Sequence, residues 1–344
     1  MQEVMDPGFG VAGLEYSDRP AFAQAYALAG RFILIETTDA RIRDLFNHHF
    51  AAWHIEQIEE QVPADRLVTI SIARGAAPPH PEHLEPFAVA QGGICYTDAN
   101  SYFFSNNGSV VEATTAAPRV QVWLAENCLN DGVAMAQLIF NATMTALRRC
   151  ALYELHAAGV VGPDGGGVLV IGPSGSSKST LATQLAAAGW KYLSDDTLLL
   201  YENGGVIEAR ALRRVFAVTN ETFDVFDNLQ LPAATIAPFD PTKLRFEPDA
   251  VFPQGFSLSC RPTSLFFSRL ANERSSTRAL SPAETLTKLL RMCPWACYDK
   301  ATARNHLQLL SDLARQARGF DLSVGRDLFG QPQKSSDYLM ARAQ

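Results

Sequence analysis

The chain lacks the long apolar run that a membrane-spanning helix needs. No segment approaches the roughly 18–20 consecutive apolar residues of a membrane span. The acidic start, residues 1–10, has no basic stretch followed by an apolar one, so no export signal is expected. Cysteine is also scarce, with six in 344 residues, and the close pair Cys293 and Cys297 has no second pair nearby to complete a zinc site. We therefore expect a cytoplasmic protein with reduced thiols and no membrane partner.

Clusters of basic residues are missing as well. Lys and Arg number 29 against 36 Asp and Glu, which gives a net charge of −7 with His neutral. Without a block rich in Lys or Arg, this balance argues against nucleic-acid binding through the phosphate backbone. The 47% of apolar residues is ordinary for a chain that buries a sizeable core. The length predicts two domains, with one large domain as the alternative.

The first 147 residues predict a β-rich α+β domain. The alternation of apolar and polar residues favours strands at the following places: 31–37, 67–73, 94–96, 101–104, 110–113 and 119–124. Asn107-Gly108 is a strong hairpin turn, and the Pro-rich stretch 76–86 is a loop. A helix with Asn130 or Asp131 as its cap closes the domain. No group of chemically active residues stands out, so we expect this domain to serve acceptor binding or assembly.

The sequence of residues 148–328 is typical of an α/β domain, and we expect a flexible tail at 329–344. Expected strands are 155–160, 168–171, 191–193, 197–201, 206–212 and 263–270, and expected helices are 178–188, 282–291 and 302–318. Ser281 is a good N-cap for the second of these helices, because Pro282 stands at the first helical position and Glu284 at the third.

One motif in this domain carries chemistry. An apolar strand ends at Ile171, and the next residues are small and open a helix, which is the strand–loop–helix context of a phosphate-binding P-loop. Backbone N–H groups and the helix N-terminus would hold phosphate oxygens, Lys178 would reach the β- and γ-phosphates, and the Ser179 hydroxyl would bind Mg²⁺. The residues expected to bind ATP are Gly172, Pro173, Ser174, Gly175, Ser176, Ser177, Lys178, Ser179 and Thr180.

Two further features qualify the motif. Glycine normally precedes the lysine, whereas this chain has Ser177, which fits if its φ is negative. Asp195 and Asp196 end a short strand after the P-loop helix, where one carboxylate could act as a base and the other could lie on the metal side. The alternative is a strand end with solvated acids, since adjacent acids are common in turns.

These residues together resemble the C-terminal domain of the HPr serine kinase/phosphorylase family. The resemblance rests on Leu155-His156-Ala157-Ala158-Gly159, on the P-loop, and on Gly189-Trp190-Lys191-Tyr192-Leu193-Ser194-Asp195-Asp196. It is specific over residues 150–200 and weaker up to about residue 325. Because the family's Leu-Glu-x-Arg-Gly signature is missing and the first 145 residues differ, the chain is more similar to HPr-kinase-related proteins of peptide-modification systems, including kinases of lasso-peptide precursors.

The resemblance implies a P-loop kinase domain of the HPr kinase and phosphoenolpyruvate carboxykinase type, with a mixed sheet. It implies Asp195 as the base, His156 near the phosphates, and Asp196 with Ser179 on the Mg²⁺ side. The expected activity is ATP- and Mg²⁺-dependent transfer of the γ-phosphoryl group to a serine of a peptide or protein, with a homo-oligomer compatible with the family. The identity of the acceptor stays open.

Two other functions remain open at this stage. One is a nucleotide-binding regulatory or scaffold protein whose turnover is weakened by Ser177, and the other is a kinase of small-molecule hydroxyl groups. The cation that contacts the transferred phosphoryl group also stays open, and the candidates are Arg213, Arg214, Lys243 and Arg245.

Overall fold

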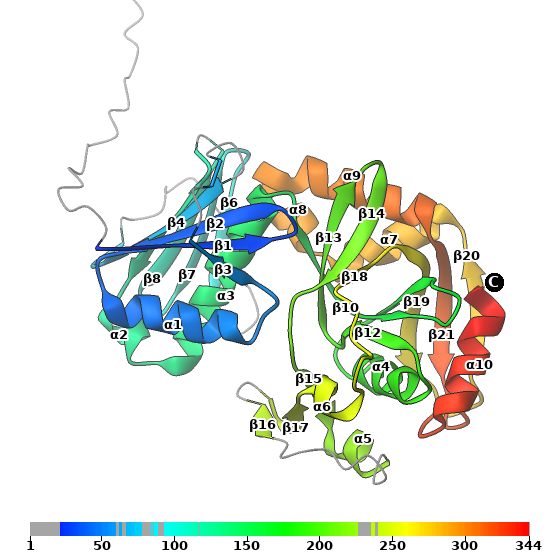
Figure 1. Cartoon of the computed structure of the whole chain (residues 1–344). Helices are drawn as coiled ribbons and strands as arrows, with labels where there is room; N and C mark the ends of the chain where they lie inside the picture. Colours follow the sequence, from blue (N-terminus) through cyan, green and yellow to red (C-terminus); the bar gives the residue numbers. More distant parts are fainter. Residues whose placement is uncertain are drawn as a thin grey trace, which may run out of the picture.

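The computed structural model has a mixed α/β fold with two large sheets (Figure 1). It describes residues 21–59, 62–63, 67–77, 84, 86–88, 93–115, 117–225, 235–237 and 240–343. The acidic start and most of the Pro-rich stretch 76–86 lie outside these residues. Among the helices of the described part, none combines the length and apolarity needed to cross a membrane.

The N-terminal half forms a nine-stranded sheet in the order β3-β1-β2-β4-β9-β8-β7-β6-β5. Strands β2, β4 and β9 pair in parallel, and the other neighbours pair antiparallel. The strands are β1 (Phe22–Leu28), β2 (Arg31–Thr37), β3 (Glu56–Ile58), β4 (Leu67–Arg74), β5 (Pro86–Ala88), β6 (Ile94–Thr97), β7 (Ser101–Asn106), β8 (Ser109–Thr114) and β9 (Arg119–Leu124). The expected hairpin at Asn107-Gly108 is confirmed, with positive φ at both residues.

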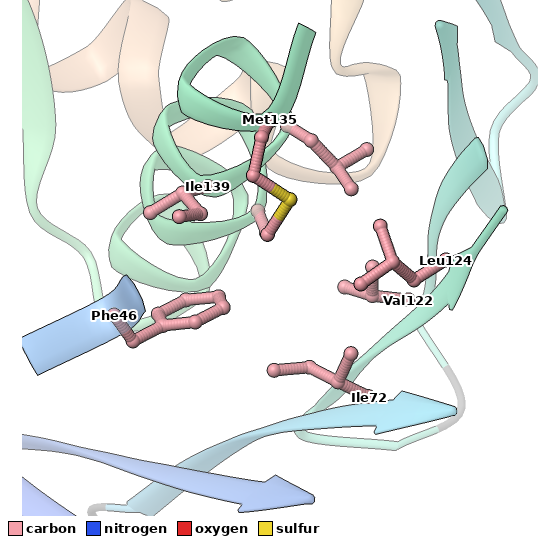
Figure 2. Close-up of a pocket in the computed structure, with 8 residues that line it drawn as sticks. Phe46, Ile72, Val122, Leu124, Met135 and Ile139 are labelled. Atoms are coloured by element: carbon pink, nitrogen blue, oxygen red, sulfur yellow. The ribbon is translucent and has the colours of Figure 1, made fainter. Parts of the chain in front are cut away.

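Helices α1 (Ala40–Ala51), α2 (Glu126–Leu129) and α3 (Gly132–Arg149) accompany this sheet. Asp131 caps α3 by accepting hydrogen bonds from the N–H groups of Val133 and Ala134. Figure 2 shows Phe46 of α1 and Met135 and Ile139 of α3 facing apolar side chains of β4 and β9. The space between them leaves no room for a water molecule, so this layer is a packed core and not a ligand cavity.

The C-terminal half contains a second large sheet in the order β18-β14-β13-β10-β11-β19-β21-β20, with β12 also paired to β10. Its strands are β10 (Tyr153–Val161), β11 (Gly167–Ile171), β12 (Lys191–Ser194), β13 (Thr197–Asn203), β14 (Val206–Ala211), β18 (Ser259–Cys260), β19 (Pro262–Leu270), β20 (Ser276–Leu280) and β21 (Arg318–Val324). Its helices are α4 (Lys178–Ala187), α7 (Pro282–Met292), α8 (Trp295–Tyr298) and α9 (Lys300–Gln316). The capping box of Ser281 and Glu284 at the start of α7 is confirmed.

A small third sheet lies apart from the two large ones, in the order β15-β17-β16 (Figure 1). It consists of β15 (Phe216–Thr219), β16 (Thr235–Ala237) and β17 (Asp240–Phe246), with α5 (Asn220–Val225) and α6 (Pro248–Val251) nearby. Phe216, Val218 and Phe246 are buried in one apolar cluster with Leu181 of α4. The alternate residues of β15 and β17 therefore lie on the other face of the sheet.

The two halves of the chain are joined by a buried charge network. Arg148, at the end of α3, is 1% exposed and donates to Glu154 at 2.5 Å and to Asp299 at 2.9 Å. Arg149 donates to the same carboxylate of Asp299 at 2.9 Å. Since breaking one partner of a buried pair leaves an uncompensated charge, this network fixes α3 against the start of α9.

The expected flexible tail at 329–344 is wrong. Residues Pro332–Ala343 form helix α10, which packs against α4. Gln184 donates to the Ser335 hydroxyl at 3.0 Å, and the Trp190 indole N–H donates to the Ser336 hydroxyl at 2.8 Å. The polar composition was misleading because these serines satisfy buried polar groups, while Leu339 is fully buried in the same core as α4.

We predict that Leu339→Ala destabilises the whole fold. Truncating a fully buried leucine should lower the free energy of unfolding by about 2–4 kcal/mol. Urea denaturation measures the effect, and Lys334→Ala, at an exposed position of the same helix, is the matched control. A change below about 0.5 kcal/mol in Leu339→Ala would show that α10 is not part of the core.

Candidate functional site

The structure contains the expected strand, loop and helix in order. Strand β11 is buried throughout, residues 172–177 form the loop, and α4 begins at Lys178. Gly172 leaves no room for a side chain, because a Cβ there would lie 2.4 Å from the Ser176 hydroxyl and 2.7 Å from the carbonyl oxygen of Ser268. The Ser176 hydroxyl is 3.2 Å from that of Ser268, which ties the loop to β19.

Lys178 is folded into this loop. Its Nζ donates to the carbonyl oxygens of Gly172 at 2.8 Å and Pro173 at 2.9 Å, and the residue is only 6% exposed. Burial lowers the pKa of Lys178 to about 8, with Asp196 acting in the opposite direction. The Nζ of Lys178 therefore lies among the carbonyl oxygens of the loop, at the start of α4.

Ser177 differs from the expectation of a negative φ. Its φ is +73°, in the left-handed region that favours glycine. It stands at the N-cap of α4, and its hydroxyl donates back to the carbonyl oxygen of Ser176 instead of capping the helix. The backbone thus keeps the shape that a glycine would adopt, at a cost of about 1–2 kcal/mol for a residue with a Cβ.

Asp195 and Asp196 follow β12 and point to different partners. Asp195 is 1% exposed, and its Oδ2 accepts a hydrogen bond from the N–H of Ala217 at 2.9 Å. Burial, followed by the neighbouring charge of Asp196, raises the pKa of Asp195 to about 6, and a hydrogen bond from the Ser179 side chain partly offsets this rise. The Ser179 hydroxyl also lies 3.4 Å from the carbonyl oxygen of Asp195.

Asp196 instead faces a histidine and an arginine. Its Oδ1 is 3.1 Å from His156 Nδ1, and its Oδ2 is 3.2 Å from a terminal nitrogen of Arg213. Strand pairing explains the first contact, since His156 of β10 lies opposite Thr197, the residue after Asp196. Burial alone would raise the pKa of Asp196, but His156 and Arg213 outweigh burial and hold that pKa well below its usual value.

The two hydroxyls at the start of α4 have partners outside the helix. Ser179 contacts Asp195, whereas the resemblance placed Ser179 with Asp196 on the Mg²⁺ side, and that expectation stays a prediction. The Thr180 hydroxyl lies 2.8 Å from that of Thr222 in α5. In the described part of the chain, no three His, Cys, Asp or Glu side chains gather closely enough to hold a metal ion by themselves.

Three of the four candidate cations lie at this site. Arg213 binds Asp196, Lys243 influences the pKa of Lys178, and Arg245 lies opposite Ala217 in the pairing of β15 with β17. Arg214 is directed elsewhere, because its Nε donates to the carbonyl oxygen of Trp53 at 2.7 Å. Sequence reasoning could not place Arg245, because α5 and β16 separate β15 from β17 along the chain and no local motif indicates that the two strands pair.

The left-handed φ of Ser177 leads to a testable prediction. Ser177→Gly should raise the free energy of unfolding by about 0.5–1 kcal/mol, because relief of the left-handed strain exceeds the extra backbone entropy of glycine. Ser174→Gly, in the same loop but without positive φ, is the control and should destabilise. Thermal and urea unfolding measure both variants. A destabilised Ser177→Gly would contradict the strained geometry.

Comparison with known proteins gives a weak structural likeness. No family model matches the chain, and neither does any curated protein. Among solved structures, the chain is similar to that of the Hpr(Ser) kinase/phosphatase from Coxiella burnetii, with 11% identity and a TM-score of 0.31. The match covers 55% of this chain and 95% of the other. The functional argument therefore rests on the contacts of the site itself.

Proposed function

We propose that this chain is an ATP-dependent phosphotransferase that moves the γ-phosphoryl group to a hydroxyl, most simply that of a serine in a peptide or protein. The observation that carries the proposal is the position of Lys178 in a glycine-containing loop at a helix N-terminus, with two adjacent carboxylates close by. Phosphoryl transfer needs positioned cations, a metal ion and a proton acceptor, and this site offers residues for each role.

The loop would hold the β- and γ-phosphates of ATP. Lys178 now donates to two backbone carbonyl oxygens, and phosphate oxygens would replace them as stronger, charged acceptors. The first N–H groups of α4 have no partner within the helix and attract anions. Gly175 has a φ of +78° and open space around its Cα, so the backbone can approach the phosphates closely there.

The donor set near Ser179 fits Mg²⁺. This ion prefers oxygen ligands and is usually held by one or two carboxylates together with substrate phosphates. The Ser179 hydroxyl and the buried Asp195 carboxylate supply such oxygens. Burial and then the charge of Asp196 raise the pKa of Asp195, and a divalent cation would offset the repulsion between the two acids. When bound, Mg²⁺ would neutralise charge on the phosphates.

The proton acceptor would be His156, held by Asp196. An incoming hydroxyl must reach its base, and the side chains of His156 and Asp196 are 39% and 25% exposed, whereas Asp195 is 1% exposed. Because Asp196 lies at the Nδ1 of His156, the Nε2 is left to accept the proton of the hydroxyl. This assignment differs from the roles that the sequence resemblance implies, in which Asp195 is the base and Asp196 lies on the Mg²⁺ side.

A second function is favoured by one observation. Ser177 adds a strained residue with a side chain where the loop would otherwise have a relaxed glycine, which favours a nucleotide-binding regulatory or scaffold protein with weak turnover. Such a protein would bind ATP and Mg²⁺ without transferring phosphate to peptides or to small molecules.

The roles of the acids predict distinct kinetic defects. Asp196→Asn and His156→Gln should lower the rate of phosphate transfer by about 100-fold at saturating Mg²⁺, the usual contribution of a positioned base. Asp195→Asn should instead raise the Mg²⁺ concentration needed for half-maximal rate. Transfer from γ-labelled ATP to a serine peptide pool and to a metabolite pool measures these effects, with Asp164→Asn, in a turn before β11, as the control.

Two outcomes would overturn these assignments. If Asp195→Asn loses transfer at every Mg²⁺ concentration while Asp196→Asn keeps it, Asp195 is the base. If the unmodified protein binds ATP but labels neither pool, the phosphotransferase proposal fails and the regulatory function stands. Labelling of the metabolite pool alone would identify a small-molecule kinase.

A further inference from the structure

The end of α1 in the N-terminal half lies directly against the site. The N–H of His54 donates to the carbonyl oxygen of Leu212 at 2.7 Å. The N–H of Arg214 donates to the carbonyl oxygen of Ala52 at 3.0 Å. Trp53 and Arg213 form a β-bridge between these hydrogen bonds. Arg213 also binds Asp196. A single residue, Arg213, therefore links the N-terminal half to the acids of the site. We call the contact of residues 49–54 with residues 210–214 and β17 the seam.

The seam gathers positive charge in a chain whose net charge is −7. Four arginines act on its two histidines: Arg213 and Arg245 on His49, and Arg210 and Arg214 on His54. The pKa of each histidine is lowered to about 4, mainly by burial and to a smaller extent by these arginines. The acids that act on this group are Asp195 and Asp196 in the site and Asp249 near His54.

Several polar atoms at the seam are buried without a partner. They are Nε2 of His49, Nε of Arg210 and Nε of Arg213. An unpartnered buried polar atom costs about 1–3 kcal/mol, and a bound water or ion is one of the ways in which native proteins offset this cost. Two of these atoms are guanidinium N–H donors, and a bound anion could accept hydrogen bonds from them.

Strand pairing directs Arg245 toward the same place. Arg245 lies opposite Ala217, whose N–H holds the Asp195 carboxylate. Side chains of directly opposed residues emerge on the same face of a sheet about 5 Å apart. Burial and then the charge of Arg213 lower the pKa of Arg245, so that like charges face each other here. A bound carboxylate would relieve this repulsion.

We propose that the seam is an anion subsite for the acceptor, which takes the carboxylate of an acidic residue next to the serine that receives the phosphoryl group. His49, Arg213 and Arg245 would contact the carboxylate, so the N-terminal half contributes directly to substrate choice. The inference rests on the proposed phosphotransferase function, because it assigns the substrate class of that same site: acidic peptides.

Equilibrium binding of two peptides tests the subsite without requiring transfer. Fluorescein-labelled Asp-Asp-Ser-Asp-Asp and its amide counterpart Asn-Asn-Ser-Asn-Asn would be titrated with the full chain and followed by fluorescence anisotropy. We expect the acidic peptide to bind about tenfold more tightly at low salt, with the preference falling toward about 0.5 M salt. The preference should persist with saturating Mg²⁺ and ADP, because the subsite lies outside the P-loop.

Substitutions at the seam test whether the acidic peptide binds there. Arg245→Gln and His49→Phe should each weaken binding of the acidic peptide by about three- to tenfold, whereas Arg245→Lys, which keeps the charge, should retain most of it. Arg261→Gln is the matched control, since Arg261 is exposed at the opposite end of β11 from the P-loop. It should bind both peptides as the unmodified chain does.

Three results would overturn the subsite: equal binding of the two peptides, an unchanged preference in Arg245→Gln, or loss of the preference with Mg²⁺ and ADP, which would place the peptide in the P-loop. Failure of the proposed function is a separate result. It would appear as no labelling of any peptide from ATP, whatever the binding preference.

Discussion

Two adjacent carboxylates at the end of one short strand are the constraint on which the rest of the site depends. Neighbouring ionised acids repel each other, and the structure separates their tasks by giving them different surroundings. Asp195 is buried beneath the Ala217 N–H, with Ser179 beside it, and its pKa is raised to about 6. Asp196 is surrounded by His156 and Arg213, which hold its pKa low. Environments that push two pKa values apart are typical of acids with different roles.

The same constraint explains why the N-terminal half matters to the site. Arg213 balances Asp196, and the backbone around Arg213 is held by Ala52, Trp53 and His54. On the other side of the junction, Arg148 and Asp299 fix α3 to the C-terminal half. A movement of α1 would therefore change the surroundings of Asp196. The relation between the halves is thus part of the site, and not only of its assembly.

Local patterns predicted the local parts of this structure. The strand, the small residues and the helix around Lys178 could be placed because they are contiguous and follow one physical rule. The capping box at Ser281 and the turn at Asn107-Gly108 were predictable for the same reason. The helix α10 was missed because its serines look like tail composition, although they hydrogen-bond to Gln184 and Trp190 far away in the sequence.

Backbone conformation in the loop and contacts between distant segments could not be predicted from the sequence. A loop of this shape requires a positive φ at the residue before Lys178, and only the structure shows that Ser177 adopts it. The adjacency of Asp195 and Asp196 was visible, but their partners depend on the pairing of β10 with β13 and on the end of β12. The charges of Arg213 and Arg245 act on His49 across three distant segments of the chain, and no spacing rule encodes this arrangement.

Binding of a fluorescent ATP analogue with Mg²⁺ to the unmodified chain and to Lys178→Ala tests the central claim most directly. The account predicts saturable binding by the unmodified chain and a loss of affinity of at least about 30-fold in Lys178→Ala, because a buried charge-assisted contact to phosphate is worth about 2 kcal/mol or more. Lys334→Ala, on the surface of α10, should bind normally. Equal affinity of Lys178→Ala and the unmodified chain, with both proteins folded, would contradict the assignment of this loop to nucleotide phosphates.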